Sequence, residues 1–374
     1  MRIGIDARFY GPHGKGLGRY TQKLLENLEK IDQKNEYFVL LRKENFDEYQ
    51  PKNANFQKIL ADFRWYSISE QVRMPMLLNK LELDLVHFLH FNVPVFYRKK
   101  FVITIHDLIL IHFPTLKAST LGPVWYWLKF LAYKTVIRSA VKRSQKIIAV
   151  SEFTKNDIIK HYKISEEKIA VTREACDQGE NVSEIEPGKV LAKYGIIKPC
   201  ILYVGNAYPH KNLEALVLAF GKLNMPKYNF QLALVGKMDY FYERLRKFTR
   251  EQKVEDVVFT GHLPDQELDV LYHNARLYVF PSLYEGFGLP PLEAMAKGVP
   301  VASSDHPCMR EILGESAYYF NARDIADISR AMEKMLQSEE IRKKYSRLGL
   351  EQVKKYSWEK MARETAEIYK NIKE

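Results

Sequence analysis

The sequence has few cysteines, no long apolar run and no low-complexity tract. Its three cysteines are scattered and form no C-x-x-C pair, which argues against a disulfide framework or a zinc site and fits a reducing compartment. No apolar run approaches the roughly 20 residues that a membrane-spanning helix needs. Met1 leads directly into a strand-like segment and not into a signal peptide. These absences predict a cytoplasmic protein.

Length and charge favour a globular chain of two domains. A chain of 374 residues suits two domains of roughly 150–200 residues each. The net charge of +11 comes from the first part alone, since residues 1–150 have 24 Lys and Arg against 13 Asp and Glu, whereas residues 151–374 have 33 of each. A basic domain of this kind attracts phosphates, including those of anionic lipids, lipid-linked sugars and nucleic acids.

Short runs of β-branched and aromatic residues alternate with helix-length segments along the chain. Runs that are apolar on both faces and separated by helices predict parallel sheets built from right-handed βαβ units. The series breaks once, at the polar segment 177–189, which is typical of an interdomain linker. The predicted strands are 2–6, 37–41, 84–88, 101–105, 146–150 and 168–172 before the break, and 200–204, 231–235, 257–260, 277–280 and 299–303 after it.

We therefore predict an α/β protein with two doubly wound, Rossmann-like domains that face each other across a cleft. Ligands of such sheets bind beyond the carboxyl ends of the strands. Four motifs follow predicted strands and are candidates for chemistry.

The strongest motif is P-S-L-Y-E-G-F-G-L-P-P-L-E at 281–293. Its two prolines suit the first turn of a helix, where a missing N–H is tolerated. Gly286 and Gly288 let a ligand approach the backbone, and the start of a helix favours an anion. Glu285 on the loop and Glu293 inside the helix are suited to accept hydrogen bonds from sugar hydroxyls. For one carboxylate taken alone, the alternative to a ligand-binding role is a helix N-terminus at which the helix dipole favours an acidic residue.

The second motif, Y-V-G-N-A-Y-P-H-K-N at 203–212, is a strand ending at Gly205, a short loop and a predicted helix start near Asn212. Lys211 can reach a diphosphate that lies over the helix start. A solvated lysine on a polar loop is an equally good interpretation of this motif taken alone.

The third motif is the opening strand followed by the glycine-rich segment 14–18 and an amphipathic helix. Its glycines come too late for a dinucleotide fingerprint. We expect a flexible loop that offers N–H groups from Gly16 and Gly18 into the cleft.

The fourth motif is His106-Asp107, directly after a buried strand. His106 is a candidate to orient a sugar hydroxyl or to stabilise developing positive charge through its carbonyl neighbourhood, whereas Asp107 is suited to cap the following segment. His87 and His90 are interpreted as structural.

Residues 108–151 contain no Asp or Glu but seven Lys and Arg and six aromatic residues. Basic residues with Trp and Tyr are typical of lipid headgroup contacts. At 100° per residue the cations scatter around the helix, so a half-buried helix with basic flanks is as good an interpretation as a membrane surface.

Together these motifs resemble the retaining glycosyltransferases of family 4, with the two-domain GT-B fold, over essentially the whole chain. Glu285 and Glu293 match the E-x7-E signature of that family, and similar segments occur at 235–237, 260–262 and 356–363. The resemblance predicts an acceptor-side domain at 1–180, a nucleotide-sugar-binding domain at 181–355, and a helix at 356–374 that crosses back to the first domain.

The resemblance implies a role for each matched residue. Glu285 would bind the transferred sugar, with His106 beside the anomeric carbon, and these two are the catalytic candidates. Glu293 would hold the ribose and Lys211 the diphosphate. The other donor-binding candidates are Gly16, Gly18, Gly205, Asn206, Gly261, Phe287, Gly288 and Leu289. The family retains the anomeric configuration and implies no cofactor or metal, and this sequence has no D-x-D motif.

One departure concerns the diphosphate. Relatives often place an arginine where this chain has Asn206 or His210. The diphosphate site is therefore less cationic than usual, unless Lys15, Arg19 or His210 supplements it.

On this resemblance we predict a metal-independent, retaining transferase of hexosyl or deoxyhexosyl units, with mannosyl favoured. The donor would be a nucleotide sugar and the acceptor a glycan or lipid-linked sugar of surface polysaccharide synthesis, in the cytoplasm or on an anionic inner membrane face. The alternative is a degenerate, non-catalytic protein that binds sugar nucleotides or glycans. The first strand lacks the G-x-G-x-x-G of an NAD-dependent oxidoreductase, and no nucleic-acid-binding motif occurs.

Overall fold

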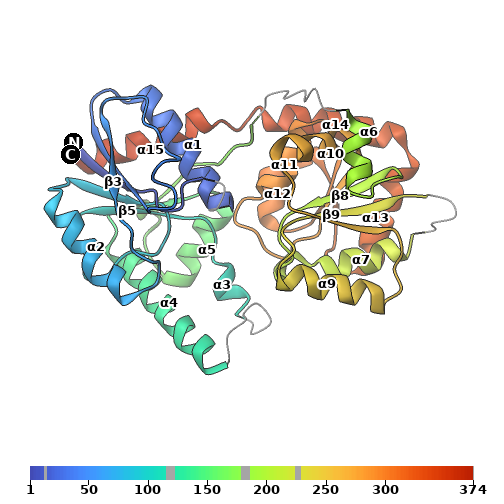
Figure 1. The fold of residues 1–374 in the computed structure, drawn as a ribbon, viewed down its shortest axis with the longest axis horizontal. Helices are drawn as coiled ribbons and strands as arrows, with labels where there is room; N and C mark the ends of the chain where they lie inside the picture. Colours follow the sequence, from blue (N-terminus) through green and yellow to red (C-terminus); the bar gives the residue numbers. More distant parts are fainter. Residues whose placement is uncertain (12–14, 115–122, 178–185, 224–228, 374) are drawn as a thin grey trace. The chain divides into compact units, whose positions relative to one another are not determined.

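The computed structural model describes residues 1–11, 15–114, 123–177, 186–223 and 229–373, and the chain divides into two compact units (Figure 1). Unit 1 comprises Met1–Leu108, Ser119–Glu174 and Ser357–Glu374. Unit 2 comprises Ile109–Ala118 and Ala175–Tyr356. The division thus falls at Glu174, where the sequence suggested residue 180, and the chain returns to unit 1 at Ser357.

Unit 1 is built on a parallel sheet whose described strands lie in the order β3-β2-β1-β4-β5-β6-β7. In β1, an inner strand, Ile5 pairs with Val39 on one side and with His87 on the other. The order reverses between β1 and β4, which is the switch point of a doubly wound sheet. The strands are β1 Arg2–Asp6, β2 Glu36–Leu41, β3 Phe56–Leu60, β4 Leu85–Phe88, β5 Phe101–Ile105, β6 Lys146–Ala149 and β7 Ile169–Val171.

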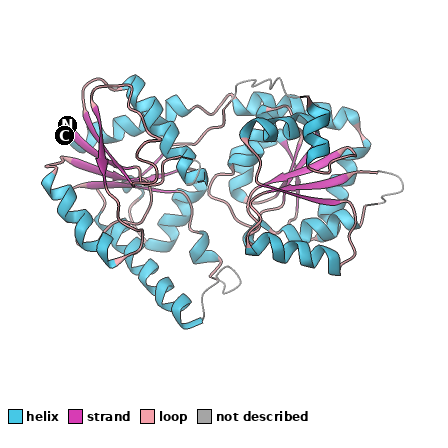
Figure 2. Ribbon diagram, viewed as in Figure 1, coloured by secondary structure: helices cyan, strands magenta, loops and turns pink. Residues whose placement is uncertain are grey.

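Helices cover both faces of this sheet (Figure 2). They are α1 Lys15–Ile31, α2 Ile68–Lys80, α4 Pro123–Arg143, α5 Glu152–Tyr162 and the C-terminal α15 Trp358–Lys373, with a short 3-10 turn, η3, at Glu166–Lys168. Helix α1 packs against α15, and its Leu24 and Leu28 are fully buried. In α15, the buried Tyr369 hydroxyl lies 2.6 Å from His87 Nδ1. The C-terminal helix is thereby tied into the core of unit 1.

Unit 2 has a second parallel sheet, whose described strands lie in the order β10-β9-β8-β11-β12-β13. The strands are β8 Cys200–Val204, β9 Gln231–Val235, β10 Val257–Gly261, β11 Ala275–Phe280, β12 Val301–Ser304 and β13 Ala317–Phe320. The helical elements are α3 Ile109–His112, α6 Pro187–Lys193, η4 Pro209–Lys211, α7 Leu213–Gly221, α9 Tyr240–Glu251, α10 Asp265–Asn274, α11 Leu289–Ala296, α12 Pro307–Leu313, η5 Gly314–Ser316, α13 Ile325–Gln337 and α14 Glu339–Val353.

The two doubly wound parallel sheets confirm the predicted fold class, but two strands were missed. Strands β3 and β13 are both sheet edges, and each has partly exposed residues. Edge strands need not be apolar on both faces, so they lack the pattern by which the inner strands were recognised.

The predicted glycine-rich loop is wrong within the described residues. Gly16 and Gly18 lie in the first turns of α1, which begins at Lys15, whereas Gly14 lies outside the described residues. A Cβ on Gly18 would come within 2.7 Å of the Phe9 carbonyl oxygen, so this glycine lets the β1–α1 segment pack directly on the helix.

The predicted linker at 177–189 is only partly described, and its last residues begin α6 at Pro187. Pro187 at the first helical position has the fixed φ that suits a helix start.

Within the described residues, no helix is long and apolar enough to cross a membrane.

Candidate active site

The E-x7-E segment forms the loop after β11 and the start of α11. Gly288 precedes the helix with φ +93°, a value that favours glycine, and a Cβ there would lie 2.6 Å from Met309 Cε. The prolines 290 and 291 occupy the first turn, as predicted. They also remove two N–H groups from that turn, so Leu289 is its remaining donor. The anion site expected here therefore has fewer donors than an ordinary helix start.

Glu285 and Lys211, assigned to the sugar and the diphosphate, form an ion pair with each other. Lys211 Nζ lies 2.6 Å from Glu285 Oε1, and the two side chains are only 13% and 8% exposed. Lys211 ends η4, and the next residue, Asn212, has φ +60°. The Asn212 side-chain amide donates to Pro281 O and Ala322 O, at 3.2 and 2.7 Å. These bonds hold the β8–α7 segment against the loop of Glu285.

Glu293 lies one helical turn inside α11, as its spacing predicts. The hydroxyl of Tyr272 donates to Glu293 Oε2 at 3.3 Å. Phe287 is buried, and its carbonyl accepts a weak hydrogen bond from the thiol of Cys308.

The remaining donor-binding candidates of unit 2 follow one edge of its sheet. Gly205 follows β8 and Gly261 ends β10, with β9 between them. Gly205 N donates to Val235 O at 3.0 Å, and Gly236 N donates to Gly261 O at 3.1 Å. Because β11 flanks β8 on the other side, the loop of Glu285 continues the same carboxyl edge. The structure thus brings the candidates of unit 2 together.

His210 does not add a cation to this edge at neutral pH. Burial, and then the charge of Lys211, lower the pKa of His210 to about 4, against an opposing effect of Glu285. Its ring packs near Tyr208 and Phe113. The suggested supplement to the diphosphate site by His210 is therefore wrong at neutral pH, and the side chain of Lys15 lies outside the described residues.

In unit 1, both ring nitrogens of His106 face hydrogen-bond acceptors. Nδ1 lies 2.9 Å from Glu174 Oε1 and Nε2 lies 3.1 Å from the carbonyl oxygen of Leu89. Burial lowers the pKa of His106, but the hydrogen bond and charge of Glu174 outweigh it, and the net pKa is raised. Two acceptors favour a doubly protonated ring. Both ring nitrogens of His106 are thus engaged within unit 1, and its role beside the transferred sugar stays a prediction.

His87 has the structural role predicted for it, with Thr104 Oγ1 at 2.8 Å from Nε2 and Tyr369 at Nδ1.

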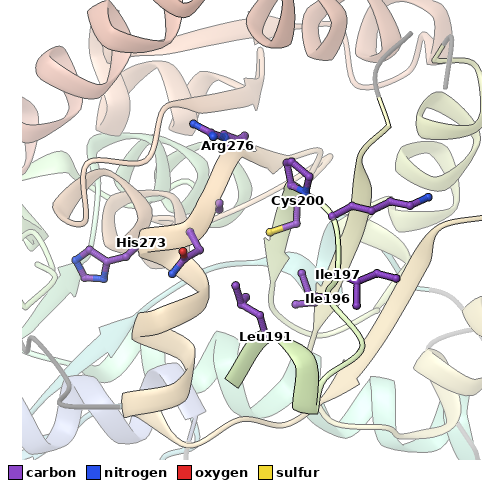
Figure 3. Close-up of a pocket in the computed structure, with 10 residues that line it drawn as sticks. Leu191, Ile196, Ile197, Cys200, His273 and Arg276 are labelled. Carbon is purple, nitrogen blue, oxygen red and sulfur yellow. The ribbon is translucent and has the colours of Figure 1, made fainter. Parts of the chain in front are cut away.

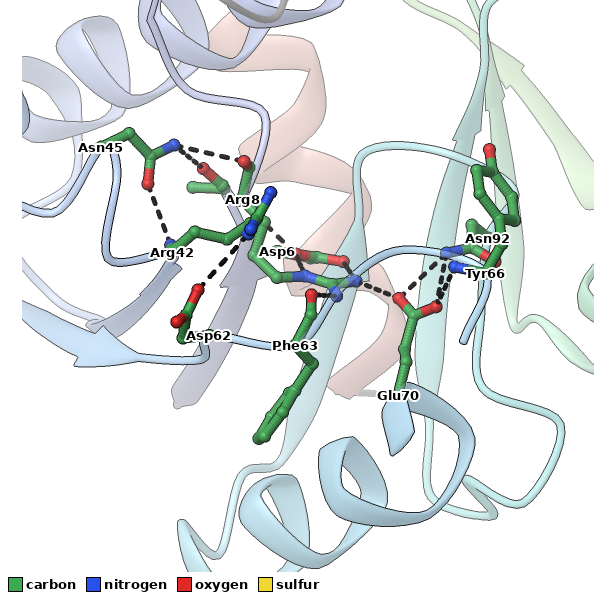
Figure 4. A network of polar contacts seen from close by, with 10 residues as sticks. Asp6, Arg8, Arg42, Asn45, Asp62, Phe63, Tyr66, Glu70 and Asn92 are labelled. Carbon is green, nitrogen blue, oxygen red and sulfur yellow. Dashed lines mark hydrogen bonds and ion pairs between the residues drawn. The ribbon is translucent and has the colours of Figure 1, made fainter. Parts of the chain in front are cut away.

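A buried charged cluster at the carboxyl edge of unit 1 was missed by sequence reasoning. The Arg8 guanidinium lies between Asp6 and Glu70, with nitrogen–oxygen distances of 2.7 Å to each (Figure 4). Asn92 donates to both oxygens of Glu70, at 2.9 and 3.0 Å. The sequence signal that could have indicated this cluster is the D-x-R at 6–8, at the end of β1. Glu70 gives no such signal, because it lies in α2, 62 positions after Arg8. Arg8 neutralises one of two buried carboxylates, and hydrogen bonds satisfy the other.

A surface hollow of unit 2 lies away from these residues. Its volume is about 390 Å³, and it is lined by residues at the amino ends of β8 and β11, among them Cys200 and Arg276 (Figure 3). It lies at the opposite edge of the sheet from Glu285. Among the described residues, no group of three or more His, Cys, Asp or Glu is arranged to hold a metal ion.

Two family profiles together match nearly the whole chain. The profile described as Glycosyltransferase Family 4 matches residues 14–177, and the profile described as Glycosyl transferases group 1 matches residues 193–352. The chain belongs to glycosyltransferase family 4. It is therefore a glycosyltransferase of the GT-B fold, and both profiles include the motifs described above.

The chain is similar along its length to O-antigen mannosyltransferases. It is 28% identical over 379 residues to O-antigen chain mannosyltransferase B of Escherichia coli, covering 95% of this chain and 96% of that protein. It is 27% identical to O-antigen chain mannosyltransferase RfbU of Salmonella typhimurium, covering 84% and 85% of the two chains. The structure of sucrose-phosphate synthase from Thermosynechococcus elongatus superposes with a TM-score of 0.76 at 18% identity, covering 100% of this chain and 99% of that one. This likeness supports the fold alone.

Proposed function

We propose that this protein transfers a mannosyl or related hexosyl or deoxyhexosyl unit from a nucleotide sugar to a glycan or lipid-linked acceptor, with retention of the anomeric configuration. The reaction would serve surface polysaccharide synthesis. The observation that carries the proposal is the joining of Glu285, Lys211 and Glu293 at one edge of unit 2, in a chain whose full-length relatives are named mannosyltransferases.

In the proposed reaction the bond between the sugar and the diphosphate breaks, and its electron pair leaves with the nucleoside diphosphate. Lys211 would stabilise the charge that develops on this leaving group. Glu285 would accept hydrogen bonds from the transferred sugar, and Glu293 from the ribose. The acceptor hydroxyl would attack the face from which the diphosphate leaves and give its proton to a diphosphate oxygen. This route needs no protein-bound metal.

Turnover separates this proposal from the alternative of a non-catalytic sugar-nucleotide-binding protein. The purified protein is incubated with GDP-mannose and other nucleotide sugars, with and without a glycan or lipid-linked acceptor, and released nucleoside diphosphate is measured. Acceptor-dependent release of nucleoside diphosphate, together with an α-linked product from an α-configured donor, supports the retaining transferase. Binding of a nucleotide sugar without release, across the acceptors of a surface polysaccharide pathway, would favour the binding protein.

We further propose that unit 1 holds the enzyme at an anionic membrane surface through α4. Trp127 and Leu131 in this helix are 52% and 63% exposed. Spacings of four residues place Lys134, Arg138 and Lys142 on the same side of the helix. These three cations therefore form one side of α4, whereas Lys129 and Arg143 of the same helix lie off it. Exposed aromatic and apolar residues beside cations suit a lipid headgroup layer.

Figure 1 shows the N-terminal part of α4 extending away from the sheet of unit 1, and Trp127, Leu128 and Leu131 of this helix are exposed. A lipid-linked acceptor would be presented at the same surface to which the helix binds. The proposal for α4 is independent of the donor chemistry of unit 2.

A further inference from the structure

Three buried tyrosine hydroxyls bind the backbone carbonyls of three consecutive residues at the carboxyl end of β8. The tyrosines come from β8, α9 and β11, and none of their side chains is exposed. Burial raises the pKa of each phenol above its usual value, so the hydroxyls remain protonated donors at neutral pH. The bonds are Tyr278 Oη to Val204 O at 3.2 Å, Tyr242 Oη to Gly205 O at 2.8 Å and Tyr203 Oη to Asn206 O at 2.9 Å. Tyr242 Oη also lies 3.0 Å from a second acceptor, Val235 O.

These bonds also set the direction of the N–H groups that follow. A trans peptide unit points its C=O and the next N–H in opposite directions, and the described residues contain no cis peptide bond. Fixing the Gly205 carbonyl therefore aims the N–H of Asn206 away from Tyr242. Fixing the Asn206 carbonyl likewise aims the N–H of Ala207 away from Tyr203. Two consecutive N–H groups are thus held in fixed orientations at the edge where the site residues meet.

Neither of these two N–H groups has a hydrogen-bond partner among the described residues, whereas the preceding one, Gly205 N, donates to Val235 O. Asn206 and Ala207 are partly exposed. Successive N–H groups without a protein partner are available to donate to an anion together.

Two glycines make room for the tyrosine hydroxyls. Gly205 has φ +153°, and a Cβ there would lie 2.7 Å from Tyr203 Oη. A Cβ on Gly236, after β9, would lie 2.5 Å from Tyr242 Oη and would overlap the Gly205 carbonyl oxygen. A side chain at either position would displace a hydroxyl from its carbonyl.

The side chains around this loop supply little free positive charge. Lys211 is paired with Glu285, and His210, whose pKa is lowered to about 4, is neutral near pH 7. An anion bound here therefore depends on main-chain donors to a greater extent than in a site lined by arginines.

We propose that Tyr203, Tyr242 and Tyr278 are positioning residues, which hold the peptide units after β8 so that the N–H groups of Asn206 and Ala207 donate to the diphosphate of the donor. This inference rests on the proposed function and deepens it, because it assigns part of diphosphate recognition to the main chain. The tyrosines themselves would not touch the ligand.

The test compares Tyr242→Phe with Tyr319→Phe in the full chain. Tyr319 is the matched control, because its hydroxyl, like that of Tyr242, lies within hydrogen-bond distance of two carbonyl oxygens of unit 2, those of Met309 and Gly314. Calorimetry measures the affinity for GDP, UDP and ADP and for the corresponding nucleosides. Loss of one oriented donor to a charged diphosphate should weaken its binding about tenfold. We expect Tyr242→Phe to show this loss of diphosphate affinity with unchanged nucleoside affinity. We expect Tyr319→Phe to change neither affinity.

The outcomes separate this inference from the proposed function. A wild-type protein that binds none of the diphosphates and shows no turnover would overturn the proposed function itself. If the wild type binds and turns over while folded Tyr242→Phe keeps its diphosphate affinity within twofold, the positioning role is wrong and the enzyme assignment stands. Equal weakening of diphosphate and nucleoside would also overturn it. Should Tyr242→Phe fail to fold by circular dichroism, Tyr203→Phe, which loses a single bond, is judged by the same criterion.

Discussion

Because Lys211 and Glu285 form an ion pair, we expect that removing the charge of Glu285 increases the affinity for nucleoside diphosphate and abolishes sugar transfer. The two charged atoms lie 2.6 Å apart, so a diphosphate must compete with Glu285 for Lys211. Glu285→Gln keeps the shape of the side chain and removes this competitor together with its repulsion of the phosphates. Nucleoside diphosphate should therefore bind more tightly, while transfer is lost because the sugar loses a charged acceptor.

The size of the effect follows from the burial of the pair. Exposed ion pairs contribute about 0–1 kcal/mol, whereas breaking a fully buried pair costs about 3–5 kcal/mol. At 13% and 8% exposure the pair is nearer the buried limit, but it opens onto solvent, so about 1–2 kcal/mol is released for ligand binding. This corresponds to a roughly five- to thirtyfold lower Kd for nucleoside diphosphate.

Calorimetry with nucleoside diphosphate and a radiolabelled transfer assay measure the two effects. Glu214→Gln is the control, since it breaks an exposed pair with Arg244, 3.0 Å apart in the same unit, and should change neither. In the opposite direction, Lys211→Met should lower the affinity for nucleoside diphosphate about ten- to a hundredfold and leave the affinity for the nucleoside unchanged. Unchanged or weaker diphosphate binding by a folded Glu285→Gln protein would refute the competition between Glu285 and the ligand.

Three further predictions concern the membrane, pH and metals. Replacing Lys134, Arg138 and Lys142 by Glu should remove co-sedimentation with anionic vesicles, because each cation contributes about 1 kcal/mol to membrane binding. The control, replacement of Arg330, Lys343 and Lys354 in unit 2 by Glu, should leave co-sedimentation unchanged. Equal binding of the wild type to neutral and anionic vesicles would contradict the membrane proposal. The raised pKa of His106 stabilises unit 1 fully below its ordinary value of 6.5, and this contribution is lost as pH rises through the raised pKa. Thermal unfolding of His106→Gln should therefore differ most from wild type at acidic pH, and a constant difference from pH 5 to 9 would count against the charged ring. Transfer should persist in excess EDTA, and its loss with recovery on adding Mg²⁺ would reject the metal-independent route.

The inner strands and the order of the motifs could be predicted from the sequence because burial on both faces leaves a continuous apolar run. Strand β3, F-Q-K-I-L, has two adjacent polar residues and a single buried one, and β13, A-Y-Y-F, has two partly exposed tyrosines at its centre. Both are edge strands, for which that pattern is not required. Likewise, two glycines close together suggested a loop, yet Gly16 and Gly18 lie in α1, because close packing of the segment after β1 needs a small residue inside the helix.

The side-chain partners of the site were harder to predict because they are distant in sequence. Lys211 and Glu285 are 74 positions apart, and His106 and Glu174 are 68 apart. A motif gives the residue types at one strand end, but the sheet order decides which strand ends are neighbours. The sequence therefore indicated the candidates, and only the fold revealed that two of them neutralise each other and that His106 has both nitrogens bound.

The absence of arginines around Gly205 need not mean a weak donor site, because electrostatic complementarity depends on free charge and on oriented dipoles together. An arginine beside Gly205 would add a charge but would also compete for Glu285, which lies within reach of Lys211. In this chain the nearest imidazole is neutral, the nearest lysine is paired, and three tyrosines fix the loop that bears two unpaired N–H groups among the described residues. A ligand that frees Lys211 from Glu285 gains both the lysine and the N–H groups at once. Such a site would bind a nucleoside weakly and its diphosphate much more tightly, because only the diphosphate reaches the lysine and the N–H groups.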